Sequence, residues 1–522
     1  MKHSETKDLI RIDEGLSRVI IMRCFGLKPL SMTMAVKRFT NNMSDSLKKT
    51  MVNALKWSAV DRTLQQGVQF VIGIVLARLL CPADYGLIGM IMIFAQIAYV
   101  MVESGLGSAL VRTEECTSKH TNTVFFTNLA ISAVMYVLLF FSAPYIALFF
   151  NQPALVNISR VMFTAILFNA FYIVPFNLCV KKMDYKTIAK VNLVSTLLSG
   201  ASGIAMALCD FGVWALVTQQ ASYHAFRMLA FYALATWTPR IEYSLKVLKE
   251  YFSFSVHILG SSLLTVIFNN LYTFLIGKFY AIDKVGYYTQ ANKLNETVNF
   301  TFQAILNSTY SMFAKIHTEI ERLVRVMRSL IQKVSVVNIP LSVFLIMAAG
   351  PIFNLLLGEK WMAAVPYFQI ICLANIFTPL YFISLHAINA IGKSRSTFII
   401  ELIKRMMILL SVAVCLIYKT DITTMLYCYA ACCWCSVLVA AISVKKNFSI
   451  RIITQIFDCK DGLCIALLIG TICHIADVAI SNLYIEIVVQ ALLSIAVYAG
   501  YILCFRKELI QETKSLIKGN YE

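Results

Sequence analysis

The sequence predicts an all-helical protein that crosses a membrane many times. Of its 522 residues, 59% are hydrophobic and only 14% are charged, whereas soluble domains carry about 25% charged residues. Apolar stretches of about 20 residues, the length that spans the hydrocarbon core of a bilayer, follow one another along most of the chain. A membrane β-barrel would instead show short alternating segments. The expected fold class is therefore a polytopic helical membrane protein.

Hydropathy predicts about 14 spanning segments. They are expected at roughly 57–80, 85–103, 121–143, 155–180, 188–208, 212–234, 251–277, 285–312, 329–349, 361–391, 397–418, 423–443, 461–479 and 484–504. The first segment and the eighth are unusually polar for this role. The first contains "DRTLQQGVQ" and the eighth reads "YYTQANKLNETVNF" at its start.

Lysine and arginine are concentrated in one set of the loops between these segments. Examples are "VKKMDYK", "IGKSR" and "VKKNFSIR", whereas the loops on the other side, such as "CPADYG" and "CDFG", are very short. Positively charged loops remain in the cytoplasm, so both termini are expected there. The net charge of +18 is explained by these loops and does not indicate binding to nucleic acid.

A helix–turn–helix pattern occurs twice along the chain. "VLARLLCPADYGLIGM" begins at position 75 and "LIGKFYAIDKVGYYTQ" at position 275, so that Arg78 aligns with Lys278 and Gly86 with Gly286. A second pair, "APYIALFFN" and "GPIFNLLLG", begins at positions 143 and 350. Repeats of six helices enter the membrane from the same side, as in transporters with parallel repeats. The sequence thus predicts two pseudo-symmetric six-helix lobes.

The predicted domain organisation follows from this repeat. An N-terminal lobe is expected at 43–240, a C-terminal lobe at 241–445, two additional helices at 446–505 and a cytoplasmic tail at 506–522. The apolar stretch within the polar segment 1–42 is too short for a secretory signal. It is either a cytoplasmic extension or the product of a start codon placed too early, with Met43 as the true start.

Several polar and charged residues fall inside the predicted spanning helices, where each charge costs about 2.5–3.5 kcal/mol and usually faces a cavity or a partner. The candidates for binding a cargo are Arg62, Gln65, Gln66, Gln69, Arg227, Asn292, Lys293, Asn295, Lys404 and Arg405. The candidates for coupling to an ion are Asp61, Glu296 and Glu401. Because cations outnumber carboxylates in this set, the sequence indicates a cationic cavity for an anion. Arginine in particular matches phosphate oxygens with two parallel hydrogen bonds.

Simpler roles were weighed for some of these features. Arg78 and Lys278 end their helices and could reach the headgroups, and Glu401 could form a local pair with Lys404 or Arg405. The cysteines of "CCWC" suit packing better than a redox or zinc site. "IGKSRST" resembles a phosphate-binding loop, but Ala387 stands where its first glycine belongs. No metal or organic cofactor is predicted.

The sequence resembles Wzx-type polysaccharide flippases, in particular their WzxC-like branch. The resemblance begins at "MSDSLKKTMVNALKWSAVDRTLQQGVQF" from Met43 and continues through "ESGLGSALV", "VGYYTQANKL" and "LLLGEKWMAAVPYFQI". It implies the fold of the superfamily of multidrug and toxin exporters, oligosaccharide-lipid transporters and the lipid II flippase. That fold has 14 helices in two lobes with a central cationic cavity.

The resemblance also implies a function and a location. The expected function is movement of an undecaprenyl-diphosphate-linked oligosaccharide, a repeat unit of lipopolysaccharide, capsule or exopolysaccharide, across the bacterial inner membrane. Its partners would be that polyprenyl-diphosphate-linked glycan, membrane lipid, and the glycan polymerase with its chain-length machinery. Two alternatives are a small-molecule exporter, which should have an anionic cavity, and a membrane-bound glycan polymerase or ligase, which should present carboxylates on large external loops.

Overall fold

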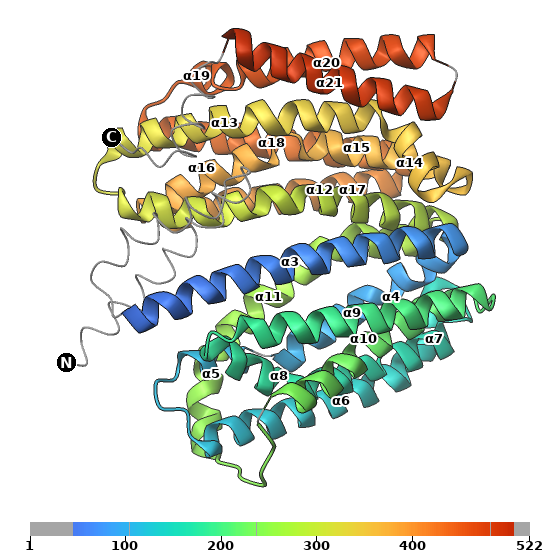
Figure 1. Ribbon diagram of the computed structural model, residues 1–522, viewed down its shortest axis with the longest axis vertical. Helices are drawn as coiled ribbons and strands as arrows, with labels where there is room; N and C mark the ends of the chain where they lie inside the picture. The colour runs from blue at the N-terminus through green and yellow to red at the C-terminus, as the bar shows by residue number, and fades with distance from the viewer. Residues whose placement is uncertain (1–44, 104, 236, 481, 506–522) are drawn as a thin grey trace. The chain divides into compact units, whose positions relative to one another are not determined.

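The computed structural model describes residues 45–103, 105–235, 237–480 and 482–505, and every long element among them is a helix (Figure 1). The predicted extension 1–42 and the predicted tail 506–522 lie outside the described residues. The predicted all-helical class is confirmed. The packing divides the chain into two units, which are called the N-terminal unit (49–290) and the C-terminal unit (291–505) below.

The N-terminal unit consists of nine helices and the beginning of a tenth. They are α3 (Asp45–Leu79), α4 (Pro82–Glu103), α5 (Leu106–Arg112), α6 (Ser118–Phe150), α7 (Leu155–Met162), α8 (Thr164–Lys181), α9 (Tyr185–Leu208), α10 (Val213–Leu234), α11 (Leu245–Phe279) and the start of α12 (Ile282–Lys315). The unit therefore ends inside α12. The sequence had placed α11 and α12 in the C-terminal lobe, and the lobes defined by the repeat remain a prediction.

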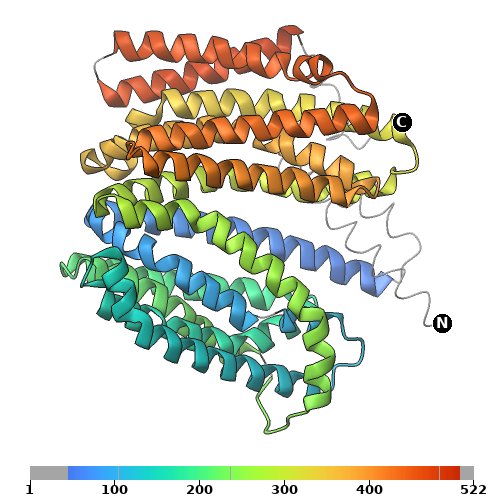
Figure 2. The same cartoon turned by 180° about the vertical axis from the view of Figure 1, so that it is seen from behind.

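The C-terminal unit continues with the rest of α12 and nine further α-helices, with one short 3₁₀ helix between them. They are α13 (Ile320–Met347), α14 (Ala349–Leu357), η1 (Glu359–Ala364), α15 (Val365–Asn375), α16 (Thr378–Ala390), α17 (Ser394–Ile417), α18 (Ile422–Phe448), α19 (Ile452–Phe457), α20 (Lys460–Ala479) and α21 (Leu483–Phe505). Figure 2 shows the same helices from behind.

Ten helical segments of the described residues are long and apolar enough to cross a membrane. Four more helices, α3, α10, α12 and α17, have 35, 22, 34 and 24 residues, which is long enough to span a bilayer. They are not among the ten because they are too polar. The total of 14 spanning helices therefore stays a prediction that rests on these polar helices.

Both copies of the helix–turn–helix pattern fold in the same way. The helix α3 ends at Leu79 and α4 begins at Pro82, while α11 ends at Phe279 and α12 begins at Ile282. The two turns also pack against each other within the N-terminal unit. A Cβ atom added at Gly86 would meet the backbone of Ile282, and one added at Gly286 would meet the carbonyl of Pro82. Glycine is required at both positions because the helix starts touch through their backbones.

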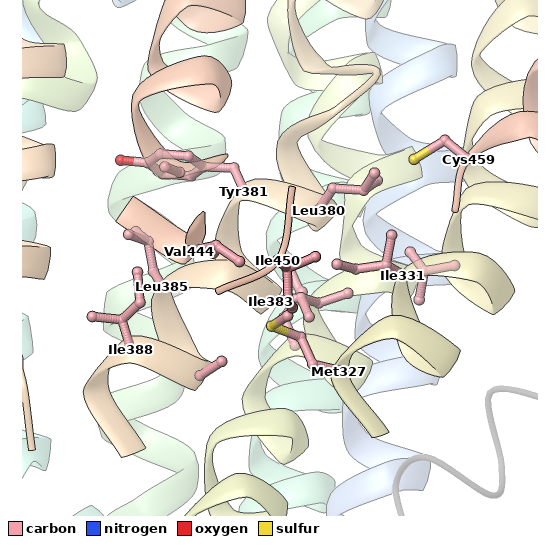
Figure 3. Close-up of a cluster of buried hydrophobic side chains, with 14 of the residues drawn as sticks. Met327, Ile331, Leu380, Tyr381, Ile383, Leu385, Ile388, Val444, Ile450 and Cys459 are labelled. Carbon is pink, nitrogen blue, oxygen red and sulfur yellow. The ribbon is translucent and has the colours of Figure 1, made fainter. Parts of the chain in front are cut away.

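The interior of the C-terminal unit is filled mainly by aliphatic side chains. Met327 and Ile331 of α13 pack with Leu380 and Ile383 of α16, as Figure 3 shows. Tyr381 belongs to the same cluster, but its hydroxyl points away from the aliphatic side chains (Figure 3). Since lipid tails are as apolar as leucine, such helices are held together by close packing and polar contacts.

The final helix pair is fastened to α13 by an ion pair whose carboxylate is buried and whose arginine is partly exposed. Asp458, whose side chain is 3% exposed, accepts hydrogen bonds of 2.8 Å from both Nε and Nη2 of Arg328. Gln332 donates a third bond of 2.8 Å to the same carboxylate. Next to it, Gly462 of α20 lies against the backbone of Ser335. The bidentate pair fixes the start of α20 on α13.

Candidate functional site

All the candidate residues predicted from the sequence lie on α3, α10, α12 and α17, the helices that are too polar to be counted among the ten candidate spans. Polar groups in a membrane helix are costly unless they have partners or water. The partners of each candidate therefore indicate its role. They are described first for the N-terminal unit and then for the C-terminal unit.

Arg227 of α10 is surrounded by aromatic rings. Its guanidinium carbon lies 4.6 Å from the centre of the Tyr172 ring and 5.2 Å from that of Phe176. The rings of Tyr223 and Phe231, one turn before and one turn after it on α10, are both at 5.9 Å. Such stacking stabilises a cation where water is scarce. The arginine is half-buried, so part of its surface remains accessible.

Two side chains share the hydroxyl group of Tyr172 on α8. Arg227 donates to it through Nη1 at 3.3 Å, and Nδ1 of His224 lies 2.9 Å from it. The imidazole of His224 is also stacked on Tyr99 of α4, with ring centres 4.9 Å apart. The Nε atom of Arg227 is buried and has no hydrogen-bond partner in the described part of the chain. Among the described residues, this N–H donor is therefore enclosed without a partner.

The candidate residues predicted on α3 fall into two environments. Asp61 accepts hydrogen bonds of 3.1 Å on each carboxylate oxygen from the amide of Asn192 on α9. Gln65 donates to the hydroxyl of Tyr223 at 3.2 Å. The structure thus joins Asp61 and Gln65 to the surroundings of Arg227. Gln66 is half-buried, while the remaining two members, Arg62 and Gln69, are exposed.

The candidates on α12 also face in different directions. Lys293 and Glu296 are exposed, and Asn292 donates to Glu296 at 2.8 Å. Asn295 is only 6% exposed, and its amide oxygen accepts a weak bond of 3.7 Å from the thiol of Cys372 on α15. Asn295 therefore lies in the packed interior of the C-terminal unit. Its predicted contact with a cargo is not favoured by this position.

The candidates on α17 gather around Tyr381 of α16. The tyrosine hydroxyl donates to Glu401 at 2.7 Å, and the ammonium of Lys404 lies 4.5 Å from the centre of the tyrosine ring. Arg405 is 3.9 Å from Glu401, and both of these side chains are about a third exposed. The local pair that was weighed as a simpler role for Glu401 is thus present with Arg405.

Sequence reasoning missed the side chains that surround these candidates. Tyr172, Tyr381, His224 and Asn192 lie in apolar runs where an aromatic or amide side chain is unremarkable by itself. One signal was available, because Tyr223 and Phe231 stand four residues on either side of Arg227 and must share its helix face. Among the described residues, no group of three or more histidine, cysteine or acidic side chains could hold a metal ion.

The family of the chain is decided by a comparison of sequences. The profile of a family described as polysaccharide biosynthesis protein matches residues 75–366, which is more than half of the chain. The chain belongs to this polysaccharide biosynthesis protein family. The predicted resemblance to Wzx-type proteins is thereby confirmed at the level of the family.

Several relatives have names that describe their biological role. The succinoglycan biosynthesis transport protein ExoT of Rhizobium meliloti (strain 1021) is 26% identical over 63% of this chain and 67% of its own length. The teichuronic acid biosynthesis protein TuaB of Bacillus subtilis (strain 168) is 24% identical over 63% and 69%. The lipopolysaccharide biosynthesis protein WzxC of Escherichia coli (strain K12) is 21% identical over 63% and 68%.

Comparison with solved structures shows which fold the chain has. It is similar to the lipid II flippase MurJ in an inward closed conformation, with a TM-score of 0.69 and 14% identity over 87% of this chain and 99% of MurJ. It is also similar to an inward-facing multidrug resistance MATE transporter of the MOP superfamily, with a TM-score of 0.57 and 15% identity over 76% and 98%. Together with its apolar helices, this fold makes the chain a multi-pass membrane protein.

Proposed function

We propose that the protein is a flippase that moves a lipid-linked oligosaccharide from the cytoplasmic to the outer leaflet of the bacterial inner membrane. The observation that carries this proposal is the placement of Arg227, Lys404 and Lys293 on helices that are too polar for lipid, in a member of the polysaccharide biosynthesis protein family. Membrane-embedded cations are costly. An anionic cargo that passes along these helices gives them a function.

The chemistry of such a cargo fits the residues. A diphosphate group and acidic sugars would be attracted by the cations, and arginine can bind phosphate oxygens with two parallel hydrogen bonds. Sugar hydroxyls would bind to the amides of Gln65, Gln66, Gln69 and Asn292. Arg62, whose side chain is exposed on α3, would contact the cargo directly. The relatives named for succinoglycan, teichuronic acid and lipopolysaccharide biosynthesis support a glycan as the cargo.

Transport would proceed by alternating access of two six-helix lobes, 43–240 and 241–445, with both termini in the cytoplasm. The membrane potential provides a driving force, because each negative charge that leaves a negative-inside cell gains about 2.3 kcal/mol per 100 mV. A diphosphate with about two charges would gain about twice that. Asp61, Glu296 and Glu401 are the carboxylates available for a coupled ion, and the exported unit would pass to the glycan polymerase and its chain-length machinery.

A small-molecule exporter of the same fold is the second candidate, but its cavity should be anionic. A glycan polymerase or ligase is the third. Deletion of the gene, followed by analysis of the sidedness of the lipid-linked oligosaccharide, separates these functions. The flippase proposal predicts that intact lipid-linked units accumulate on the cytoplasmic leaflet, and that Arg62→Ala with Arg227→Ala restores export poorly. Single units that reach the outer leaflet but are never polymerised or attached would instead indicate an enzyme.

A further inference from the structure

The helices α8–α10 of the N-terminal unit and α16–α18 of the C-terminal unit repeat one another closely, although no repeat is visible there in the amino-acid sequence. From α8 to α10 and from α16 to α18, corresponding positions are 209 residues apart. The helices α9 and α17 end at Leu208 and Ile417, and α10 and α18 begin at Val213 and Ile422. The residues in left-handed conformation obey the same offset.

These left-handed residues provide independent backbone evidence. Met183 (φ 56°) corresponds to Gly392 (φ 79°), and Asp210 (φ 58°) corresponds to Lys419 (φ 49°). Residues other than glycine adopt this conformation infrequently. Their recurrence at one spacing shows that the connections between these helices are the same in both units. The offset of 209 therefore identifies equivalent residues in α8–α10 and α16–α18.

Tyr172 and Tyr381 are equivalent by this offset. Both are nearly fully buried, with exposures of 3% and 1%, and both use the hydroxyl in a hydrogen bond to a side chain. Each ring also carries a cation at almost the same distance, 4.6 Å for Arg227 and 4.5 Å for Lys404. The two units thus contain the same arrangement of a buried tyrosine beneath a half-buried cation.

The two cations, however, come from different helices. Arg227 lies on α10, and its equivalent on α18 is Ser436, which is 2% exposed. Lys404 lies on α17, and its equivalent on α9 is Ser195, which is 0% exposed. In each unit one helix of the packed pair carries the cation and the other carries a serine. The cation and the serine have thus exchanged helices between the two units, while the cation lies on the tyrosine ring in both.

An exchange of this kind indicates what the protein needs. If each cation only stabilised the helix that carries it, there would be no reason for α10 in one unit and α17 in the other to place a cation on the equivalent tyrosine ring. A cation that is held on a ring face keeps hydrogen-bond donors for another group, and Arg227 and Lys404 are both only half-buried. An acidic group of the cargo is the partner that such a cation lacks.

We propose that Tyr172 and Tyr381 are equivalent positioning residues, each of which holds one cation for a phosphate or carboxylate group of the cargo. This inference rests on the proposed function. Transport depends on the position of the cation at the tyrosine ring. It does not depend on which of the two neighbouring helices carries the cation. It follows that the cation can be moved to the neighbouring helix without loss of transport.

The experiment moves the cation from one helix of the pair to the other and keeps the total side-chain volume nearly the same. Arg227→Ser with Ser195→Lys gives the N-terminal unit the pattern of the C-terminal unit, and Lys404→Ser with Ser436→Arg does the converse. Arg227→Ser alone should lower export about tenfold, and the added Ser195→Lys should restore most of it. The matched control, Arg227→Ser with Ser195→Gln, should not. Failure of both exchanged variants, present at normal levels in the membrane, overturns the proposal.

The tyrosines are tested by binding, which does not depend on export. With the purified full-length protein, Tyr172→Leu and Tyr381→Leu should each weaken binding of an anionic probe about tenfold, whereas the Phe variants should weaken it less because they keep the ring. Normal binding by the Leu variants overturns the proposal, whether or not the exchanged variants reach the membrane. A melting temperature like that of the wild type excludes a merely structural effect.

Two probes distinguish the source of the acidic group. Geranylgeranyl diphosphate carries the diphosphate without a sugar, and a disaccharide of uronic acid carries carboxylates without a lipid. Weakened binding of the first assigns the cations to the diphosphate, and weakened binding of the second assigns them to acidic sugars. If wild-type and Leu variants bind both probes equally while the wild type exports the oligosaccharide, the pairing is wrong and the proposed function stands. A wild type that exports nothing contradicts the proposed function itself.

Discussion

At the scale of single residues, Gly86 and Gly286 determine how closely the two copies of the helix–turn–helix approach each other. Each glycine faces the backbone of the opposite helix start, at Ile282 and at Pro82. A backbone carbonyl cannot move away as the end of a flexible side chain can. The close contact of α4 with α12 therefore depends on the absence of a side chain at both positions.

Substitution of either glycine by alanine should destabilise the protein. Gly86→Ala and Gly286→Ala both force backbone shifts, which cost about 1–3 kcal/mol in a packed interior. Thermal unfolding of the purified protein in detergent should show a lower melting temperature for both. Gly500→Ala in α21 is the control, since an added Cβ there meets no atom within 4 Å. Melting temperatures equal to that of the control would show that the backbones do not touch.

At the scale of helices, the apolar helices that are suited to contact lipid are distinct from the helices that carry the candidate polar residues. Apolar helices such as α6 and α20 belong to the candidate spans, whereas α3, α10, α12 and α17 carry the polar residues. The helix α20 is also joined to α13 through the pair of Asp458 and Arg328. Removing the arginine leaves the buried carboxylate of Asp458 without its charged partner, so this contact should matter more than an exposed pair on the same helix.

Two arginines of α13 allow a matched comparison of these pairs. Arg328→Gln should destabilise the protein by about 1–3 kcal/mol, because the buried Asp458 loses its bidentate partner. Arg322→Gln should change the unfolding free energy by less than about 1 kcal/mol, because Arg322 and Glu319 are 57% and 58% exposed. Unfolding in a denaturant series measures both. Equal effects would mean that the Asp458 pair does not anchor α20.

The same helices show what the sequence could predict and why. The turn between α3 and α4 was predictable because proline and glycine stand at the start of the second helix, and the polar residues of α3 stood out because such residues are rare in membranes. Their partners could not be predicted. Tyr172 is 55 residues from Arg227, and a tyrosine in an apolar run looks the same whether it holds a cation or packs against lipid. The burial of Asn295 could not be predicted either, because polarity alone does not say which face of α12 is buried.

At the scale of the whole molecule, the topology decides the direction of transport. The count of lysine and arginine in the loops predicts that both termini lie in the cytoplasm, and this orientation remains to be tested. Cysteines at helix ends can report this orientation. Cys81 and Cys209 lie in the short loops of one side and are exposed, and Cys504 near the end of α21 is exposed as well.

Variants that keep one cysteine each should therefore differ in labelling by a membrane-impermeant maleimide. Cys81 and Cys209 should react in intact spheroplasts, and Cys504 only after the membrane is permeabilised. Cys459, between α19 and α20, is the unreactive control on the inner side. Burial, aided by the negative charge of Asp458, raises the pKa of its thiol to about 12, so almost no reactive thiolate forms. Labelling of Cys504 in intact spheroplasts would reverse the predicted orientation.

The most direct test of the account is the movement of a lipid-linked oligosaccharide between the leaflets of proteoliposomes that contain only this protein. We expect that the wild type accelerates the movement and that Arg227→Ala with Lys404→Ala slows it about tenfold while the protein remains folded. Movement no faster than in protein-free vesicles, or equally fast with the double variant, would contradict the claim that these cations carry the cargo.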